Sequence, residues 1–210
     1  ILAAGGLGTP VILQNSGLTK AGQGLFCDLF NITCGITREA GINLLHEPSF
    51  SLLLDQFYES EGFIVMPCIY PWSGLFLLLG TKAFRVPRSK ALALMTKIRD
   101  SRIGGVDAKG KVQKEITAED KLKLEKGAAI SREILIKAGC APDSVFTSRP
   151  AGAHPGGTAA IGETVDYSLE TEIKGLYVAD ASVLPFSPGL PPIITLMALS
   201  KKLARYLLAK

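Results

Sequence analysis

The most constraining part of the sequence is its last third, where an apolar segment ends on an acid and a rigid loop leads into an apolar helix. The residues of Gly175–Ser182 predict a strand that ends at Asp180, and four prolines between residues 184 and 193 predict a stiff loop. An acid at the end of an α/β strand often lies at a ligand crevice. The helix expected to begin near Pro192 presents unpaired N–H groups and a positive dipole end, which favour an anion or an electron-rich ring edge.

A histidine precedes this region in a glycine-rich setting, A-H-P-G-G-T over Ala153–Thr158. A histidine can move protons near neutral pH, so His154 is a candidate acid or base. On its own, His154 is equally well explained as a hydrogen-bonded structural residue. Asp180 alone is better explained as a turn or cap residue.

Composition argues against a disordered chain and against a metal site. The 210 residues are 47% hydrophobic and 20% charged with a formal charge of +4, which is typical of a globular chain. The four cysteines show no C-x-x-C spacing, and His46 and His154 are the only histidines, so no metal site is expected. Free thiols in a reducing compartment, and hence a cytoplasmic location, are the expectation.

The N-terminal segment predicts a strand over Ile1–Ala4, a glycine turn, and a helix capped by Thr9 with Pro10 at its first position and an end near Gly17. Gly6-x-Gly8 is half of a dinucleotide fingerprint, and a tight strand-to-helix turn explains it as well. The chain opens on Ile1 in mid-pattern, which indicates a fragment or one half of a split protein.

The middle of the chain predicts a β-rich region with a long helix. A hairpin is expected over Val106–Val112, and a helix from about Thr117 to Gly139 with Leu122 and Ile134 among its periodic apolar residues. Other strands are expected at Leu25–Phe26, Leu29–Ile32, Phe63–Met66 and Leu75–Leu79, and short helical pieces at Leu52–Tyr58 and Lys90–Ile98.

Two stretches of unusual charge need an interpretation. Gly62–Gly80 carries no charge, but its prolines favour two buried strands around a bend over a membrane span. An apolar patch that meets a greasy substrate or a membrane surface remains an alternative. Lys82–Arg102 holds seven basic residues and a single aromatic, Phe84, which indicates a solvated face and no nucleic-acid partner.

Four segments together resemble the glucose–methanol–choline (GMC) oxidoreductases. His154–Thr158 resembles the family's H-P-x-G-T segment, and Val165–Asp166 fits the V-D that follows it. Gly175–Pro185 is similar to the flavin-contacting strand L-x-V-x-D-A-S-x-x-P. Ile1–Leu18 looks like the second family signature, A-G, S/T-P and L-x-x-S-G.

The resemblance implies an α+β fold: an antiparallel-sheet substrate domain with helices, plus C-terminal pieces of a discontinuous FAD-binding α/β domain. Residues 1–18 and 175–210 would be the pieces of the FAD-binding domain, and 19–174 the substrate domain. The family's G-x-G-x-x-G segment is not present in these residues. The resemblance therefore implies a missing N-terminal FAD-binding region as partner, without which the fragment would be apo and inactive.

The resemblance also implies roles for single residues. His154 would act as base on an alcohol hydroxyl while hydride passes to the flavin of FAD, giving a carbonyl product. Asp180 and Ala181 would contact the flavin's ribityl and pyrophosphate region, and the helix start at Pro192 and Ile193 would stabilise its N1–C2=O edge. Pro191 stands where the family has an Asn or a second His, so a partner for the substrate oxygen comes from elsewhere or His154 acts alone.

The leading hypothesis is an FAD-dependent alcohol oxidoreductase with a small-molecule alcohol as substrate. The alternative is a non-catalytic module that binds an apolar ligand or a partner, or one subunit of a split flavoenzyme; Pro191 and the uncharged Gly62–Gly80 stretch favour it slightly. A hydrolase is not supported, because no G-x-S-x-G elbow is present.

Overall fold

The computed structural model describes residues 1–39, 50–68, 76, 80–85 and 87–210. The chain divides into two compact units. The first comprises Ile1–Asp28, Arg99–Thr117 and Gly152–Lys210, and the second comprises Leu29–Ile98 and Ala118–Ala151. The first unit therefore holds both end segments of the chain together with parts of its middle. The assignment of the end segments to a flavin-binding domain stays a prediction.

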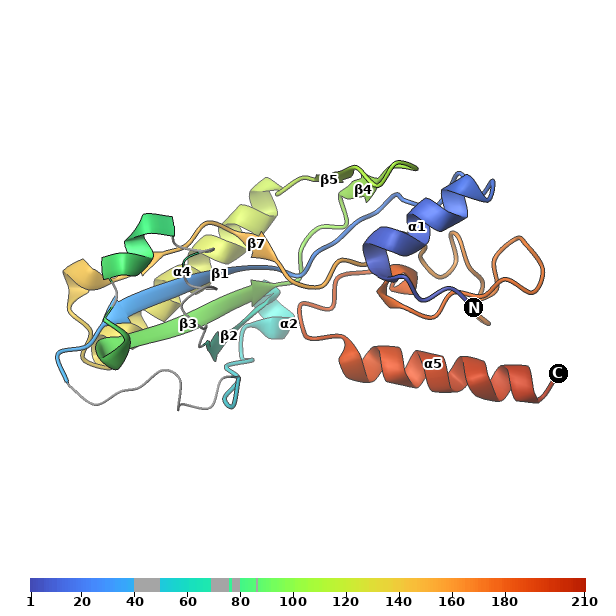
Figure 1. Ribbon diagram of the computed structural model, residues 1–210. Helices are drawn as coiled ribbons and strands as arrows, with labels where there is room; N and C mark the ends of the chain where they lie inside the picture. Colours follow the sequence, from blue (N-terminus) through green and yellow to red (C-terminus); the bar gives the residue numbers. More distant parts are fainter. Residues whose placement is uncertain (40–49, 69–75, 77–79, 86) are drawn as a thin grey trace. The chain divides into compact units, whose positions relative to one another are not determined.

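The second unit is an antiparallel sheet with a long helix packed on it, α4, which follows the sheet in Figure 1. The strands run in the order β2-β3-β1-β6, and β7 also pairs with β1. Their bounds are Leu29–Ile36 for β1, Phe63–Pro67 for β2, Ala91–Ile98 for β3, Phe146–Thr147 for β6 and Ala151–Gly152 for β7. The expected α+β class with an antiparallel sheet is confirmed, as are the strands at Leu29–Ile32 and Phe63–Met66.

The helical piece expected at Lys90–Ile98 is wrong, because this segment is the central strand β3. Ala, Leu, Met and Lys favour helices in isolation, but propensity is a weak prior that tertiary pairing overrides. β3 pairs along its length with β1, from Phe30↔Lys97 to Ile36↔Ala91, and with β2 on its other edge. A helix at this place would leave the facing edges of β1 and β2 without partners.

The expected long helix is confirmed as α4, Ala118–Lys137, and Gly139 ends it with a φ of +93°. Its buried face is not the expected one, however. Leu122 and Ile134 are 52% and 37% exposed, whereas the residues that face the sheet are Asp120, Leu124, Gly127, Ser131 and Leu135. Small residues permit this close packing: a Cβ added at Gly127 would lie 2.1 Å from Thr96 Cγ2 on β3.

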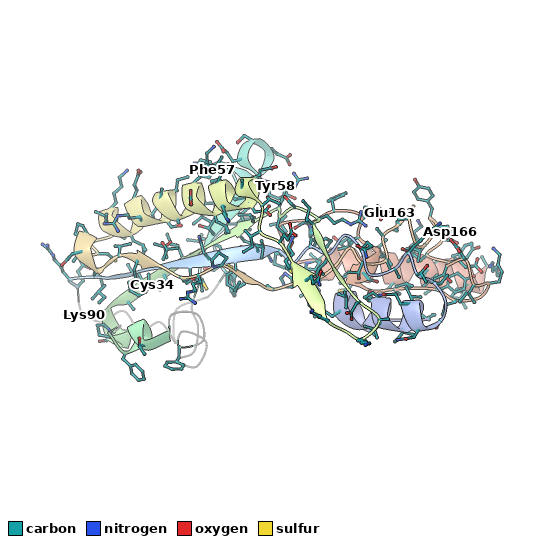
Figure 2. The ribbon with its side chains drawn as sticks, turned by 90° about the horizontal axis from the view of Figure 1, so that it is seen from above. Cys34, Phe57, Tyr58, Lys90, Glu163 and Asp166 are labelled. Carbon is teal, nitrogen blue, oxygen red and sulfur yellow. The ribbon has the colours of Figure 1, made fainter. Side chains whose placement is uncertain are left out.

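Other predictions for this unit were shifted or are not tested. The short helix expected at Leu52–Tyr58 is α2, Tyr58–Glu61. Figure 2 labels Phe57 and Tyr58 at its start, and the Phe57 ring stacks on Phe63 with centroids 5.1 Å apart. The strand expected at Leu75–Leu79, and with it the second strand of Gly62–Gly80, falls outside the described residues except for Phe76. Short 3-10 helices span Gly80–Arg85, Arg88–Lys90 and Pro142–Ser144.

Helix α1 of the first unit begins earlier than the sequence predicts. It spans Gly5–Asn15, so Pro10 lies inside the helix rather than at its first position, and Thr9 is not the cap. Pro10 has no N–H, which leaves the Gly6 carbonyl without its donor four residues on. The Thr158 hydroxyl takes that place and donates to the Gly6 oxygen at 2.8 Å. The expected end of the helix near Gly17 is confirmed.

The rest of the first unit surrounds an apolar core. Leu2 forms a parallel bridge with Val178, so the expected N-terminal strand is reduced to one bridge, as is Leu25–Phe26, where Phe26 bridges Gly156. The expected hairpin is confirmed as β4, Gly104–Val106, paired with β5, Val112–Lys114. A 3-10 helix spans Ala181–Val183 and α5 spans Ile193–Leu208, and the core includes Leu13, Val165, Tyr177, Val178 and Leu203.

Within the part of the chain that the structure describes, no helix combines the length and the apolar character needed to cross a membrane. The Lys82–Arg102 stretch is only in part the solvated face that the sequence predicts. Lys97 on β3 is 2% exposed, and the side chain of Arg102 is 21% exposed.

Candidate functional site

The histidine segment is held to the chain by its backbone. The N–H groups of Ala153 and His154 both donate to the carbonyl oxygen of Cys27, at 2.9 and 3.1 Å. Gly156 and Phe26 exchange a pair of hydrogen bonds at 3.0 and 3.1 Å. The position of the His154 backbone is therefore set by a short antiparallel contact with residues 26–27.

Glycine is required in this segment for space. A Cβ added at Gly156 would lie 2.5 Å from the Phe26 ring and 2.6 Å from the Ala181 carbonyl oxygen. A Cβ added at Gly6 would lie 2.2 Å from the Pro155 carbonyl oxygen, so α1 packs with its backbone directly on the histidine segment. Glycine thus has a local steric reason at these two positions of the segments that resemble the family.

The side chain of His154 contacts the carboxylate of Asp28. Its Nδ1 lies 3.1 Å from Asp28 Oδ2, and the histidine side chain is 33% exposed while the Asp28 side chain is fully buried. Asp28 has a φ of +48°, a left-handed conformation that is uncommon outside glycine but is tolerated by Asp and Asn. The Nδ1 edge of the ring is thus held by a buried carboxylate, and part of the ring reaches solvent.

Asp28 belongs to a buried polar network. Its Oδ1 accepts hydrogen bonds from the Ser187 hydroxyl at 2.8 Å and from the Gly189 N–H at 3.1 Å. The same Ser187 oxygen lies 2.8 Å from Oδ1 of a second buried carboxylate, Asp100. Asp100 Oδ2 in turn accepts from the Cys27 N–H and forms an ion pair with Lys114 Nζ, each at 3.0 Å.

Cys27 shows the electrostatic character of this network. Burial, together with the Asp100 charge, raises the pKa of the Cys27 thiol to about 11, although the Lys114 ammonium opposes this rise. A thiol with a raised pKa is a poor nucleophile at neutral pH. Cys27 therefore contributes its backbone to the site rather than its sulfur.

Asp180 anchors the first turn of α1. Its Oδ2 accepts from the Gly5 N–H at 3.0 Å and from the Thr9 hydroxyl at 2.5 Å, and its Oδ1 accepts from the Ser182 N–H at 2.8 Å. A carboxylate at the start of a helix is also favoured by the helix dipole. Asp180 is thus mainly engaged within the chain, with one acceptor position remaining on Oδ1.

The structure brings some of the predicted site residues together. The Gly157 N–H donates to the Ala181 carbonyl at 3.1 Å, which joins the histidine segment to the residue after Asp180. The strand expected to end at Asp180 is wrong, because Tyr177 and Val178 form only isolated bridges, with Glu170 and Leu2. Pro192 and Ile193 are tied to His154 indirectly. Gly189, three residues before Pro192, donates its N–H to Asp28, and Asp28 contacts His154. Helix α5 has no side-chain cap at Pro192, and Ile193 and Ile194 are 64% and 82% exposed.

Arg102 is a structural residue that sequence reasoning missed. Its Nε donates to the carbonyl oxygens of Gly24 and Gly157, and its two terminal nitrogens each lie 2.6 Å from a carboxylate oxygen of Glu163. The hydrogen bonds from Arg102 hold the pKa of the Glu163 carboxyl below its usual value. Figure 2 labels Glu163 with its side chain. Arg102 thereby clamps together Gly24, Gly157 of the histidine segment and Glu163.

Asp28, Asp100, Lys114 and Ser187 were missed as well. The sequence offered two weak signals for them. Asp28 stands directly before a predicted strand, and Asp100 is an acid in an otherwise basic stretch. Neither pattern is specific for a functional site. No cluster of three or more potential metal ligands occurs among the residues that the structure describes.

Comparison with known proteins gives consistent matches. The family model described as GMC oxidoreductase matches residues 89–200. The chain is 34% identical over 211 residues to the uncharacterized protein MJ1450 of Methanocaldococcus jannaschii, covering 99% of the chain and 52% of that protein. It is 26% identical over 261 residues to the long-chain-alcohol oxidase FAO3 of Arabidopsis thaliana, covering 94% of the chain and 34% of the oxidase.

Solved structures share the fold. The pyridoxine 4-oxidase from Mesorbium loti matches with a TM-score of 0.68 at 17% identity, over 100% of the chain and 51% of that protein. A formate oxidase variant from Aspergillus oryzae matches with a TM-score of 0.72 at 18% identity, over 98% of the chain and 53% of the oxidase. The chain thus spans about half the length of these structures and of the archaeal relative.

Proposed function

The chain belongs to the GMC oxidoreductase family, and on that premise we propose that it forms the C-terminal part of an FAD-dependent enzyme that oxidises an alcohol to a carbonyl. The observation that carries the proposal is the setting of His154: a backbone held by Cys27, one ring nitrogen on a buried carboxylate, and a ring that is one-third exposed. The name of the plant relative, a long-chain-alcohol oxidase, supports an alcohol as the substrate class.

His154 is the proposed base of the reaction. A neutral imidazole can accept the proton of an alcohol hydroxyl at one nitrogen while its other nitrogen is held by a hydrogen bond. Loss of that proton makes the oxygen electron-rich and prepares the carbon for oxidation. Pro191 has no polar side chain with which to assist, so His154 carries this step without help from that position.

The residues present fit FAD at one end of the chain. Helix α5 has no side-chain cap, so its first three N–H groups lack acceptors within the helix and could meet the electron-rich edge of a flavin. Next to Ala181, the Ser182 hydroxyl is buried and has no hydrogen-bond partner among the described residues. Asp180, Ala181, Pro192 and Ile193 are the residues proposed to hold the cofactor, which when bound would accept hydride from the alcohol carbon.

The test uses the full-length protein. Its absorption spectrum should show bound flavin, and an alcohol should bleach that spectrum in the absence of oxygen. We expect His154→Ala and His154→Asn to slow flavin reduction by about 10²–10⁴-fold, as for a lost acid or base. The matched control is His46→Asn, because His46 is the other histidine of the chain. Reduction of the His154→Ala protein at the wild-type rate would exclude His154 as the base.

A non-catalytic role is the second candidate, and one observation favours it. Ile193, Ile194 and Met197 expose 64–82% of their surface on the first turns of α5, an apolar surface of the kind that binds a partner or a ligand. A full-length protein that binds no flavin, yet loses a bound protein partner on Ile194→Glu, would support this candidate over the enzyme.

A further inference from the structure

We propose that Asp28 is the positioning residue of this site: it holds the His154 ring in the tautomer that carries its proton on Nδ1, so that Nε2 has the lone pair needed by a base. The inference rests on the proposed role of His154 as the base. Its physical observation is the 3.1 Å contact between His154 Nδ1 and Asp28 Oδ2.

The contact selects the tautomer because an ionised carboxylate can only accept. Oδ2 of Asp28 therefore calls for a proton on the nitrogen that faces it, and in a neutral imidazole the other nitrogen then lacks one. The same contact fixes the rotation of the ring. The substrate proton moves from the hydroxyl oxygen to Nε2: one O–H bond breaks, one N–H bond forms, and the proton on Nδ1 stays in place.

The surroundings of Asp28 fix its carboxylate before the reaction. Its Oδ1 accepts from Ser187 and Gly189, its side chain is fully buried, and its backbone takes the left-handed φ of +48°. Asp and Asn are among the residues that adopt this conformation outside glycine. The buried hydrogen bonds to Oδ1 are a second observation, independent of the histidine contact, that the carboxylate is held in place.

The Ser187 hydroxyl links Asp28 to a second buried carboxylate, Asp100. The hydroxyl has one proton and serves one of the two carboxylates at a time. Asp100 is held in turn by an ion pair with Lys114. The carboxylate of Asp28 is therefore part of a network that is in place before the proton transfer.

Asp28→Asn is the decisive variant, because it should change the contact and keep the fold. Asn tolerates the left-handed backbone, and its Oδ1 can still accept from Ser187 and Gly189. Its Nδ2 takes the place of Oδ2 and donates to Nδ1, which moves the histidine proton to Nε2. Such a change to an amide at this position of a catalytic triad is known to leave geometry intact and impose the wrong tautomer.

The tautomer is measured by ¹⁵N NMR on the full-length protein labelled with ¹⁵N-histidine. The His154 signals are assigned by their loss in His154→Gln. We expect a protonated Nδ1 and an unprotonated Nε2 in the wild type, and the reverse in Asp28→Asn. A proton that stays on Nδ1 in Asp28→Asn overturns the proposal.

Kinetics give the second readout. Asp28→Asn should lower the limiting rate of flavin reduction by about 10²–10⁴-fold with little change in KM and in the flavin spectrum. Asp28→Glu restores a carboxylate and should keep Nδ1 protonated and recover part of the rate. Asp166→Asn makes the same chemical change at an exposed carboxylate and should alter neither readout. A reversed tautomer in Asp28→Asn with an unchanged rate would overturn the positioning role of Asp28. An active His154→Ala protein would instead overturn the assignment of His154 as the base, and the NMR result alone would then test whether Asp28 sets the tautomer.

Discussion

The Thr158 hydroxyl donates to the carbonyl oxygen of Gly6 at 2.8 Å, in the place of the N–H that Pro10 lacks inside α1. We predict that Thr158→Val lowers the free energy of unfolding by about 1–3 kcal/mol, because a buried carbonyl loses its donor. Thr158→Ser keeps the hydroxyl and should lose less. Urea unfolding of each variant measures the difference.

A double-mutant cycle isolates the cause of that loss. Pro10→Ala returns an N–H to α1, which can donate to the Gly6 carbonyl within the helix. In the Pro10→Ala protein, Thr158→Val should therefore cost less than in the wild type. An equal cost in both backgrounds would mean that the Thr158 methyl and its packing, rather than the hydrogen bond, account for the effect.

The Arg102 clamp should depend on the shape of the guanidinium group. Arg102 donates to two backbone carbonyls and binds Glu163 with two nitrogens at once, which a lysine ammonium cannot reproduce. We expect Arg102→Lys to lower the free energy of unfolding by about 1–3 kcal/mol, since buried carbonyls lose charged donors. Thermal unfolding tests this, with Lys109→Arg as a control on the exposed hairpin turn. Equal stability of Arg102→Lys and wild type would contradict the clamp.

The same ion pair gives a pH dependence with a defined sign. The Arg102 hydrogen bonds lower the pKa of Glu163 from its ordinary value of 4.5. A lowered folded pKa contributes stability that is present above pH 4.5 and is lost as the pH falls through the folded value. Glu163→Gln should therefore lose less stability than the wild type on acidification below pH 4.5. Parallel curves of unfolding free energy against pH would be evidence against this pairing in solution.

Gly127 should be intolerant of alanine despite its place in a helix. Alanine is normally better than glycine there by about 0.5–1 kcal/mol, but its Cβ would lie 2.1 Å from Thr96 Cγ2. We predict a net loss of about 1–3 kcal/mol from overpacking. Thr96→Ala should reduce the loss, and Ala129→Gly on the exposed face of α4 reports the helix propensity alone. A Gly127→Ala protein that is more stable than the wild type would contradict the close packing.

Two elements show where local signals succeed and fail. The length and the end of α4 follow from local residues, because a glycine at its C-terminus with a φ of +93° ends the helix wherever it lies. Its buried face does not, since Gly127 and Ser131 face the sheet and Leu122 faces solvent. Likewise β3 is built from helix-favouring residues, and two neighbouring strands decide its conformation.

The site divides in the same way. The sequence alone determined the family of this chain and singled out His154 and Asp180, because glycines, prolines and an acid at fixed spacing encode local backbone geometry. Only the tertiary structure brought the carboxylates of Asp28 and Asp100 to the Ser187 hydroxyl and placed Asp28 against His154. The residues that contact one another here lie 87 to 159 positions apart along the chain, and no local pattern encodes which buried polar groups will satisfy one another.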